Sequence, residues 1–424
     1  MQRRAVVGGL LGGVVVASSP VRGAADASAS AAAWLAWGPS GLWAGVAGAS
    51  RVPQRIADGG VPFAPVAGGL WVAHAAPRLQ RRQHRGDGVF EIVAERDLGG
   101  ESAPAPATAQ VPVHALAASR DGRWLLAALG ENLVLLDGNG RVVRRYEGTD
   151  LERRRRGRAE GLRHHAGRRS FVVGWPAIGE WWEIPLDPAA APIYDGLVHD
   201  YRMGEAIARP GHLGVRRLPL GIDAVPDLSF ADDRVPWLAG RLGERVAVVH
   251  LDVRRQIAAL PIANARPHAA LWRCEGATGG AAAACRWWLP AGERIVVIDP
   301  ARWREVAEER LSGDVLALAA AGDLLWALVA QGDRNSLVMR RGDNAWQAVP
   351  LPEGVPRAIA SAQAAADAAA DTSAPGTGAA LLVATTQPAA LLLLTAQGRV
   401  LHRQSLPEST LVDGVLSLPP AAAR

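Results

Sequence analysis

The fold is decided by a short stretch, HALAASRDGRWLLAALGENLVLLDGNGRVVRRY, at residues 114–146. Four apolar runs alternate in it with three turns, and the runs occupy residues 114–119, 124–129, 133–137 and 141–146. Two of the turns contain Asp121-Gly122 and Asn139-Gly140. Such dipeptides between apolar runs are typical of β-hairpins. The stretch therefore predicts one unit of four antiparallel strands.

The same unit recurs along the chain. Further copies are indicated before Gly99 and at residues 161–186, 227–262, 268–311, 315–351 and 380–404. The later copies begin about 40 to 50 residues apart, which is the period of a propeller blade. We therefore predict an all-β propeller of seven or eight four-stranded antiparallel blades, with the eighth in the N-terminal part. A strand at residues 411–418 is expected to close the ring beside the first blade.

The N-terminus has the pattern of an export signal. Arg3 and Arg4 precede an apolar stretch at residues 5–17, and small residues follow at 23–25. Residues 1–25 are therefore predicted to be a signal peptide, which places the protein in the periplasm. Residues 31–418 are expected to form a single propeller domain, with a disordered loop at 362–378. No later run is long and apolar enough to predict a transmembrane anchor.

Composition excludes several classes of function. All 46 basic residues are Arg, and the densest run, at residues 153–156, lies in a predicted loop without aromatic neighbours. That arrangement does not favour nucleic-acid binding. No P-loop, dinucleotide or nucleophile-elbow motif is present. Cys274 and Cys285 allow one disulfide across a hairpin, and the absence of C-x-x-C-H argues against a covalently attached c-type haem.

Histidines supply the candidate chemistry. His114 and His268 each open the first strand of a predicted blade, so they are expected at the same end of the central channel. His199 lies in a polar insert at residues 194–205, expected between two blades and able to reach over a channel end. Imidazole ligates iron and transfers protons near neutral pH. The alternative is that His114 and His268 hydrogen-bond between blades. His164 and His165, beside the basic loop, are expected to face solvent.

A haem would also need cations for its carboxylates. Guanidinium groups bind carboxylates through paired hydrogen bonds. The candidates lie in and after the insert, at Arg202, Arg209, Arg216 and Arg217.

Several stretches resemble the cytochrome d1 domain family. The most specific are YDGLVHDYRMGEAI at residues 194–207 and PGHLGVRR at 210–217. More general likeness lies at 169–184, in VHLDVRRQIA at 249–258 and in VIDPARW at 297–303. The likeness runs from about residue 111 to 311. The family includes the haem d1 propeller of cytochrome cd1 nitrite reductase and relatives tied to haem d1 biosynthesis.

This resemblance implies eight blades with haem d1 over the channel. It assigns the iron to His114 and places His199 and His268 on the opposite haem face, where the family's histidines help protonate nitrite oxygen. The chain departs from the family pattern at Ala117, where the reductase has Arg, and at residues 269–271. The family pattern also predicts a blade between Gly148 and Gly161, where this chain has a short Arg-rich loop.

Three functions follow from these observations. The first is a periplasmic haem d1-binding propeller in electron transfer or cofactor handling, which would need a periplasmic redox or haem d1-pathway partner. The second is a cofactor-free propeller that binds another protein through its channel face. The third is an enzyme of haem d1 maturation or small-oxyanion reduction. The residues favour a binding protein over an enzyme, and an enzyme would be an oxidoreductase related to nitrite reductase or to haem d1 biosynthesis.

Overall fold

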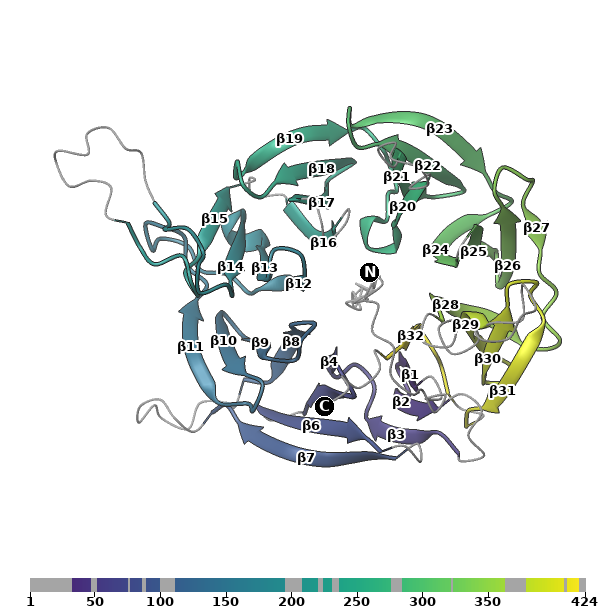
Figure 1. Ribbon diagram of the computed structural model, residues 1–424, viewed down its shortest axis with the longest axis horizontal. Helices are drawn as coiled ribbons and strands as arrows, with labels where there is room; N and C mark the ends of the chain where they lie inside the picture. Colours follow the sequence, from purple (N-terminus) through teal and green to yellow (C-terminus); the bar gives the residue numbers. More distant parts are fainter. Residues whose placement is uncertain are drawn as a thin grey trace, which may run out of the picture.

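The chain forms a ring of eight blades (Figure 1), which confirms the all-β propeller. The computed structural model describes residues 33–46, 52–74, 77–85, 89–99, 111–194, 208–219, 224–230, 236–275, 284–321, 323–362, 379–407 and 410–418. The predicted signal peptide, and all of the predicted 362–378 loop except Ala362, lie outside these residues.

Each blade is a four-stranded antiparallel sheet, and its strands are named below from the innermost to the outermost. Blade 1 contains β32 (Gly414–Ser417), β1 (Ala33–Gly38), β2 (Gly41–Val46) and β3 (Gln54–Ala57). Blade 2 contains β4 (Phe63–Val66), β5 (Gly69–Ala73), β6 (Arg78–His84) and β7 (Phe90–Asp97). Blade 3 contains β8 (Val113–Ala118), β9 (Trp124–Leu129), β10 (Asn132–Asp137) and β11 (Val142–Glu147). Blade 4 contains β12 (Glu160–His165), β13 (Ser170–Trp175), β14 (Glu180–Pro185) and β15 (Arg216–Pro219).

The second half of the ring follows the same order. Blade 5 contains β16 (Ala224–Phe230), β17 (Trp237–Leu242), β18 (Arg245–His250) and β19 (Arg255–Leu260). Blade 6 contains β20 (Leu271–Glu275), β21 (Ala284–Ala291), β22 (Arg294–Asp299) and β23 (Arg304–Arg310). Blade 7 contains β24 (Asp314–Ala321), β25 (Leu324–Gln331), β26 (Arg334–Arg341) and β27 (Gln347–Ala348). Blade 8 contains β28 (Val355–Ser361), β29 (Ala379–Thr386), β30 (Ala390–Thr395) and β31 (Val400–Ser405).

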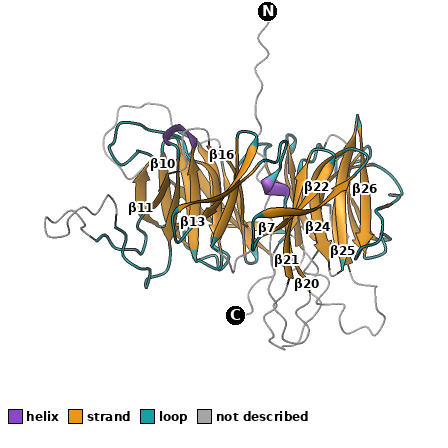
Figure 2. Ribbon diagram, turned by 90° about the horizontal axis from the view of Figure 1, so that it is seen from above, coloured by secondary structure: helices purple, strands orange, loops and turns teal. Residues whose placement is uncertain are grey.

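The strands run between the two faces of a disc (Figure 2). We name the face at which the innermost strands begin the entry face, and the opposite face the exit face. Two 3-10 helices, η1 (Pro176–Ile178) and η3 (Pro267–Ala269), are described. Within the described part of the chain, none of the helices has the length and apolar character needed to cross a membrane.

Blade 1 joins the two ends of the described chain. β32 pairs with β1, so the predicted closing strand is confirmed. The short Arg-rich loop between Gly148 and Gly161 is confirmed, since β11 and β12 are joined there by a loop that contains a Thr149–Arg156 bridge. The blade that the family pattern predicts at this place does not form. No contiguous repeat encodes blade 1, since its innermost strand lies at the other end of the sequence.

Blade 4 is interrupted by the insert that sequence analysis singled out. The insert connects β14 to β15, the third and outermost strands of one sheet, so it lies within a blade and not between two blades. Its stem is closed by backbone hydrogen bonds between Ile193 and Arg209. The outermost strand of blade 4 was not predicted, because residues 186–215 separate it from the rest of its repeat.

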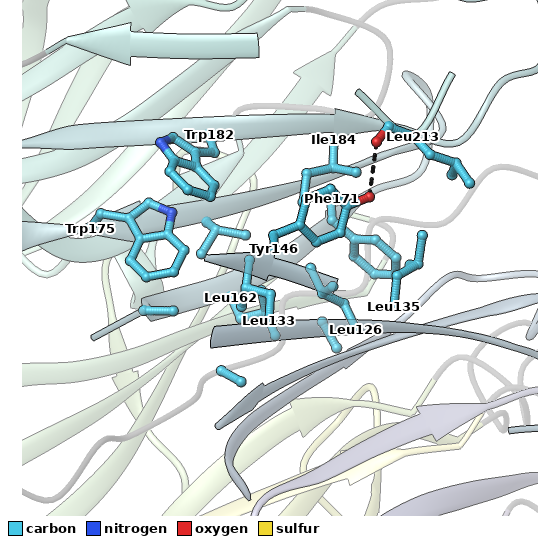
Figure 3. Close-up of a cluster of buried hydrophobic side chains, with 14 of the residues drawn as sticks. Leu126, Leu133, Leu135, Tyr146, Leu162, Phe171, Trp175, Trp182, Ile184 and Leu213 are labelled. Carbon is cyan, nitrogen blue, oxygen red and sulfur yellow. Dashed lines mark hydrogen bonds between the residues drawn. The ribbon is translucent and has the colours of Figure 1, made fainter. Parts of the chain in front are cut away.

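The apolar core is divided among the blade boundaries. A cluster of buried hydrophobic side chains lies at each of the eight boundaries. Between blades 3 and 4 (Figure 3), the rings of Trp175 and Trp182 lie 4.5 Å apart. In the same cluster the hydroxyl of Tyr146 donates a 3.0 Å hydrogen bond to the carbonyl oxygen of Leu213. This bond ties the returning leg of the insert to blade 3.

The two cysteines occupy paired register positions of one hairpin. Cys274 on β20 is directly opposite Cys285 on β21, and Cys285 is disulfide-bonded. This agrees with the cross-hairpin disulfide that the sequence allows.

Candidate functional site

His114 occupies a β-bulge at the entry face. It is the extra residue between Val113 and Ala115, where β8 changes register against β9. Bulges of this kind re-aim a side chain away from the regular alternation of a strand. The same bulge places Leu316 in blade 7 and Arg357 in blade 8. The position is therefore a repeated feature of the ring, and blade 3 fills it with an imidazole.

The ring of His114 has a defined hydrogen bond. Its Nε2 lies 2.9 Å from the carbonyl oxygen of Ala159, at the start of blade 4. A carbonyl oxygen only accepts, so Nε2 carries the hydrogen and Nδ1 carries the lone pair. Burial lowers the pKa of His114, the bond to Ala159 opposes this, and the charge of Arg158 adds to the lowering. The imidazole is therefore neutral near pH 7, as a metal ligand must be.

His268 lies at the same face in a different setting. It is the middle residue of η3, which ends one residue short of β20, and its side chain is half-buried. β20 pairs with β21 without a bulge, so His268 is not in the register of His114. The two histidines belong to blades 6 and 3, and the structure places both at the entry ends of the innermost strands.

Three charged residues that sequence analysis missed share this face. Arg158 precedes β12 and acts electrostatically on His114. Arg357 occupies the bulge of blade 8, and Asp413 directly precedes β32. Burial raises the pKa of the Asp413 carboxyl, and the charge of Arg357 opposes the rise. Their common position at the start of an innermost strand is the signal that would have identified them.

Arg216 and Arg217 were predicted to bind the carboxylates of a cofactor, but both form ion pairs with glutamates of their own blade. Both lie on β15, the outermost strand of blade 4. Arg216 Nη1 lies 3.3 Å from a carboxylate oxygen of Glu183, and Arg217 Nη1 lies 2.7 Å from one of Glu180. The guanidinium carbon of Arg217 also sits 4.6 Å from the ring centroid of Trp182. A role for either arginine at a cofactor would require breaking these contacts.

Two predicted residues belong to the middle of the insert. His199 and Arg202 lie outside the described residues, so their roles stay predictions. In the described part of the chain, no three side chains of His, Cys, Asp or Glu gather in a metal-binding cluster. The site residues that the structure does place at one face are thus His114 and His268, together with Arg158, Arg357 and Asp413.

The expectation that His164 and His165 face solvent is wrong. His165 is fully buried, and the ring of His164 lies 5.4 Å from that of buried Phe171. Adjacent residues of β12 point to opposite faces of blade 4, and blades 3 and 5 cover these two faces, which a local sequence pattern does not show.

Burial makes His164 a source of acid sensitivity. Burial lowers the pKa of His164 from 6.5 to about 4. The charge of Asp121 opposes this lowering, whereas the charges of His165 and Arg120 add to it. The unfolded chain therefore takes up this proton first, so stability falls as pH drops from 6.5 to about 4. The difference between the two pKa values of His164 corresponds to a loss of about 3 kcal/mol in the free energy of unfolding. Urea unfolding from pH 7 to pH 4 should show a clearly shallower decline of stability for His164→Gln than for the wild-type chain.

A tetrapyrrole fits the donor set at the entry face. A ligating histidine usually donates its second ring N–H to a carbonyl or carboxylate, which fixes the tautomer. His114 makes such a bond to Ala159 and keeps Nδ1 for a metal. Arg158 and Arg357 bring positive charge to the face, as a cofactor that carries carboxylates requires.

Comparison with known proteins supports the fold. No protein-family model matches the chain, and no curated protein matches its sequence. The structure is similar to that of the dihydro-heme d1 dehydrogenase NirN in complex with DHE, with a TM-score of 0.65 and 17% identity, covering 94% of this chain and 78% of that one. It is also similar to Sqt1 of Saccharomyces cerevisiae, with a TM-score of 0.50 and 8% identity, covering 82% of this chain and 86% of that one. At these identities the likenesses show the propeller fold alone.

Proposed function

We propose that this chain is a periplasmic propeller that binds a tetrapyrrole of the haem d1 class at its entry face, in electron transfer or in handling of the cofactor. The observation that carries the proposal is the neutral imidazole of His114, with Nε2–H held by Ala159 and Nδ1 left for a metal. The likeness to NirN, solved in complex with DHE, supports the choice of cofactor class. The signal peptide predicted for residues 1–25 supports the compartment.

Four of the residues at the entry face have a role in this proposal. His114 would hold the iron, and Arg158 and Arg357 would receive carboxylates of the macrocycle. His268 enters as a proton donor through the family resemblance. Both legs of the insert that carries His199 leave blade 4 at the exit face, so His199 is given no role at the entry face. A bound haem d1 supplies a redox-active iron, and because the chain has no c-type haem motif, electrons would pass to or from a separate periplasmic redox or haem d1-pathway protein.

Titration of the purified chain with haem d1 tests the proposal. We expect a saturable absorbance change at one equivalent, and at least about tenfold weaker binding for His114→Ala, because a ligand bond to the metal is lost. Added imidazole should restore the spectrum of that variant. His402→Ala, a histidine on outermost β31, is the matched control and should bind like wild type.

A chain that takes up no haem d1, or a His114→Ala variant with an unchanged spectrum and affinity, would reject the proposal. The favoured function would then be a cofactor-free scaffold. The arginine-rich loop at residues 150–158 favours that alternative, because it is held in a fixed shape at the entry face. Asp150 accepts hydrogen bonds from the Arg154 amide at 2.7 Å and from Arg155 Nε at 3.2 Å. Such a loop would suit an acidic protein partner.

A further inference from the structure

A cavity of about 570 Å³ opens between blades 3 and 4, away from His114 and His268. Its walls are the turn at residues 119–123 after β8, the turn at 166–169 after β12, and Leu186 and Pro188 at the start of the insert. These turns follow the ends of strands whose beginnings lie at the entry face, so the cavity belongs to the exit face. Its volume falls in the range of about 300–1,000 Å³ typical of small-molecule sites.

The cavity walls carry an excess of positive charge. Arg120, Arg123 and Arg169 line it, with Asp121 as the carboxylate. Asp121 Oδ1 already accepts hydrogen bonds from the Ser119 hydroxyl at 2.5 Å and the Arg123 amide at 3.0 Å. Nearby Asp187 offsets Arg169 at 3.3 Å, through a pair whose side chains are about half exposed. Exposed pairs of this kind are weak, so the arginines remain able to attract an anion.

The remaining wall is apolar and aromatic. Trp124 is half-buried, and its ring lies edge-on to that of His212 at 6.3 Å. Leu186 and Pro188 add aliphatic surface on the side of the insert. His164, uncharged near pH 7, lines the cavity as well and offers a polar contact without a charge. A ligand that fills this space therefore needs an apolar body as well as a negative group.

The walls are held in place before any ligand arrives. Ser119 fixes one turn, because its hydroxyl accepts a 2.9 Å hydrogen bond from the Trp124 amide. The returning leg of the insert is tied to blade 3 by the bond from Tyr146 to Leu213 (Figure 3). The starting leg is tied to blade 4, since the Leu186 amide donates to the Arg169 carbonyl at 2.7 Å. A preformed site loses less entropy on binding than one that must be ordered.

We propose that this cavity binds a small organic anion with a flat apolar body, of the class of aromatic carboxylates. The carboxylate would lie against Arg123 and Arg169, and the ring against Trp124. The site lies at the opposite face from His114, so it would act independently of any cofactor bound there.

Isothermal titration of the full chain with 1-naphthoate tests this site. We expect one saturable site per chain, with much weaker binding of the neutral 1-naphthalenemethanol and of inorganic phosphate. Arg123→Gln and Arg169→Gln should each weaken binding about tenfold, since each removes a charge-assisted contact. Trp124→Leu should weaken it by a similar factor while leaving the carboxylate contacts. Arg153→Gln, an exposed arginine at the entry face, is the matched control and should leave affinity unchanged.

Three results would overturn the proposal. One is the absence of saturable binding at millimolar 1-naphthoate. Another is phosphate or the neutral alcohol binding as tightly as the carboxylate. The third is an equal loss in Arg153→Gln, which would indicate general attraction to a basic surface. Circular dichroism of each variant confirms that the fold is retained, and addition of haem d1 should not compete with 1-naphthoate.

Discussion

A chain that ends at Asp413 is expected to lose most of its resistance to urea. Such a chain lacks β32, the innermost strand of blade 1, which pairs with Trp34 to Trp37 of β1. The lost strand carries Val415 and Leu416, and Leu418 follows it; all three are at most 5% exposed. Burial of three such side chains contributes about 5–9 kcal/mol. Since whole domains are stable by only about 5–15 kcal/mol, the truncated ring should be largely unfolded.

Two further variants separate ring closure from mere shortening. A chain that ends at Leu418 keeps the closing strand and should unfold like the full chain. Gly414→Val keeps the length but places a Cβ 2.1 Å from the Trp37 ring, so it should be strongly destabilised. Urea unfolding followed by tryptophan fluorescence and far-UV circular dichroism measures all three. Equal midpoints for the chains ending at Asp413 and Leu418 would show that the ring does not depend on closure.

Most of the fold could be predicted from local sequence, because the four strands of most blades are consecutive in the chain and each strand has a recognisable apolar pattern. In blade 3 the apolar runs at 114–119, 124–129, 133–137 and 141–146 differ from β8 to β11 by at most one residue at each end. Asn139-Gly140 provides the left-handed glycine that its turn requires, with a φ of 80°. The repeat pattern did not reveal blade 1, because its innermost strand lies at the other end of the sequence. It did not reveal β15 either, because the insert separates β15 from the other strands of blade 4. Pairings of that kind have no short-range signature.

The site was less predictable, because side-chain partners depend on three-dimensional neighbours. The entry-face positions of His114 and His268 follow from the repeat, since each comes at or just before a first strand. The bulge at His114 does not follow from it, and neither does its bond to Ala159 of the next blade. Arg216 and Arg217 resembled cofactor-binding residues in the sequence, yet they sit on an outermost strand beside buried glutamates.

The second large expected effect is a loss of stability when the buried Glu183 is replaced by Gln. Glu183 is 1% exposed and accepts hydrogen bonds from Arg168 Nε at 2.7 Å, Arg216 Nη1 at 3.3 Å and the Ser170 hydroxyl at 3.0 Å. Glu183→Gln removes the charge and leaves two arginines with a neutral partner. Loss of one member of a buried ion network typically costs about 3–5 kcal/mol. The urea midpoint of this variant should fall accordingly.

Arg168 explains why the effect should extend beyond blade 4. Its Nη1 also lies 2.8 Å from Asp252, which follows β18 of blade 5. Burial alone would lower the pKa of Arg168, but the hydrogen bonds and charges of Glu183 and Asp252 outweigh it and raise that pKa. The network therefore links blade 4 directly to blade 5, beside the apolar cluster at the same boundary. Glu183→Gln should therefore weaken both blade 4 and its docking to blade 5.

A double-mutant cycle and a surface control make the test specific. Arg168→Gln combined with Glu183→Gln should destabilise less than the sum of the single changes, because each change removes part of the same interaction. Glu308 offers the matched control, since it also pairs with two arginines, Arg294 at 2.8 Å and Arg310 at 3.0 Å, but on outermost β23. Glu308→Gln should shift the midpoint little, because exposed pairs are screened by solvent. Equal shifts for Glu183→Gln and Glu308→Gln would mean that burial gives the blade 4 network no special weight, and that apolar packing alone joins blades 4 and 5.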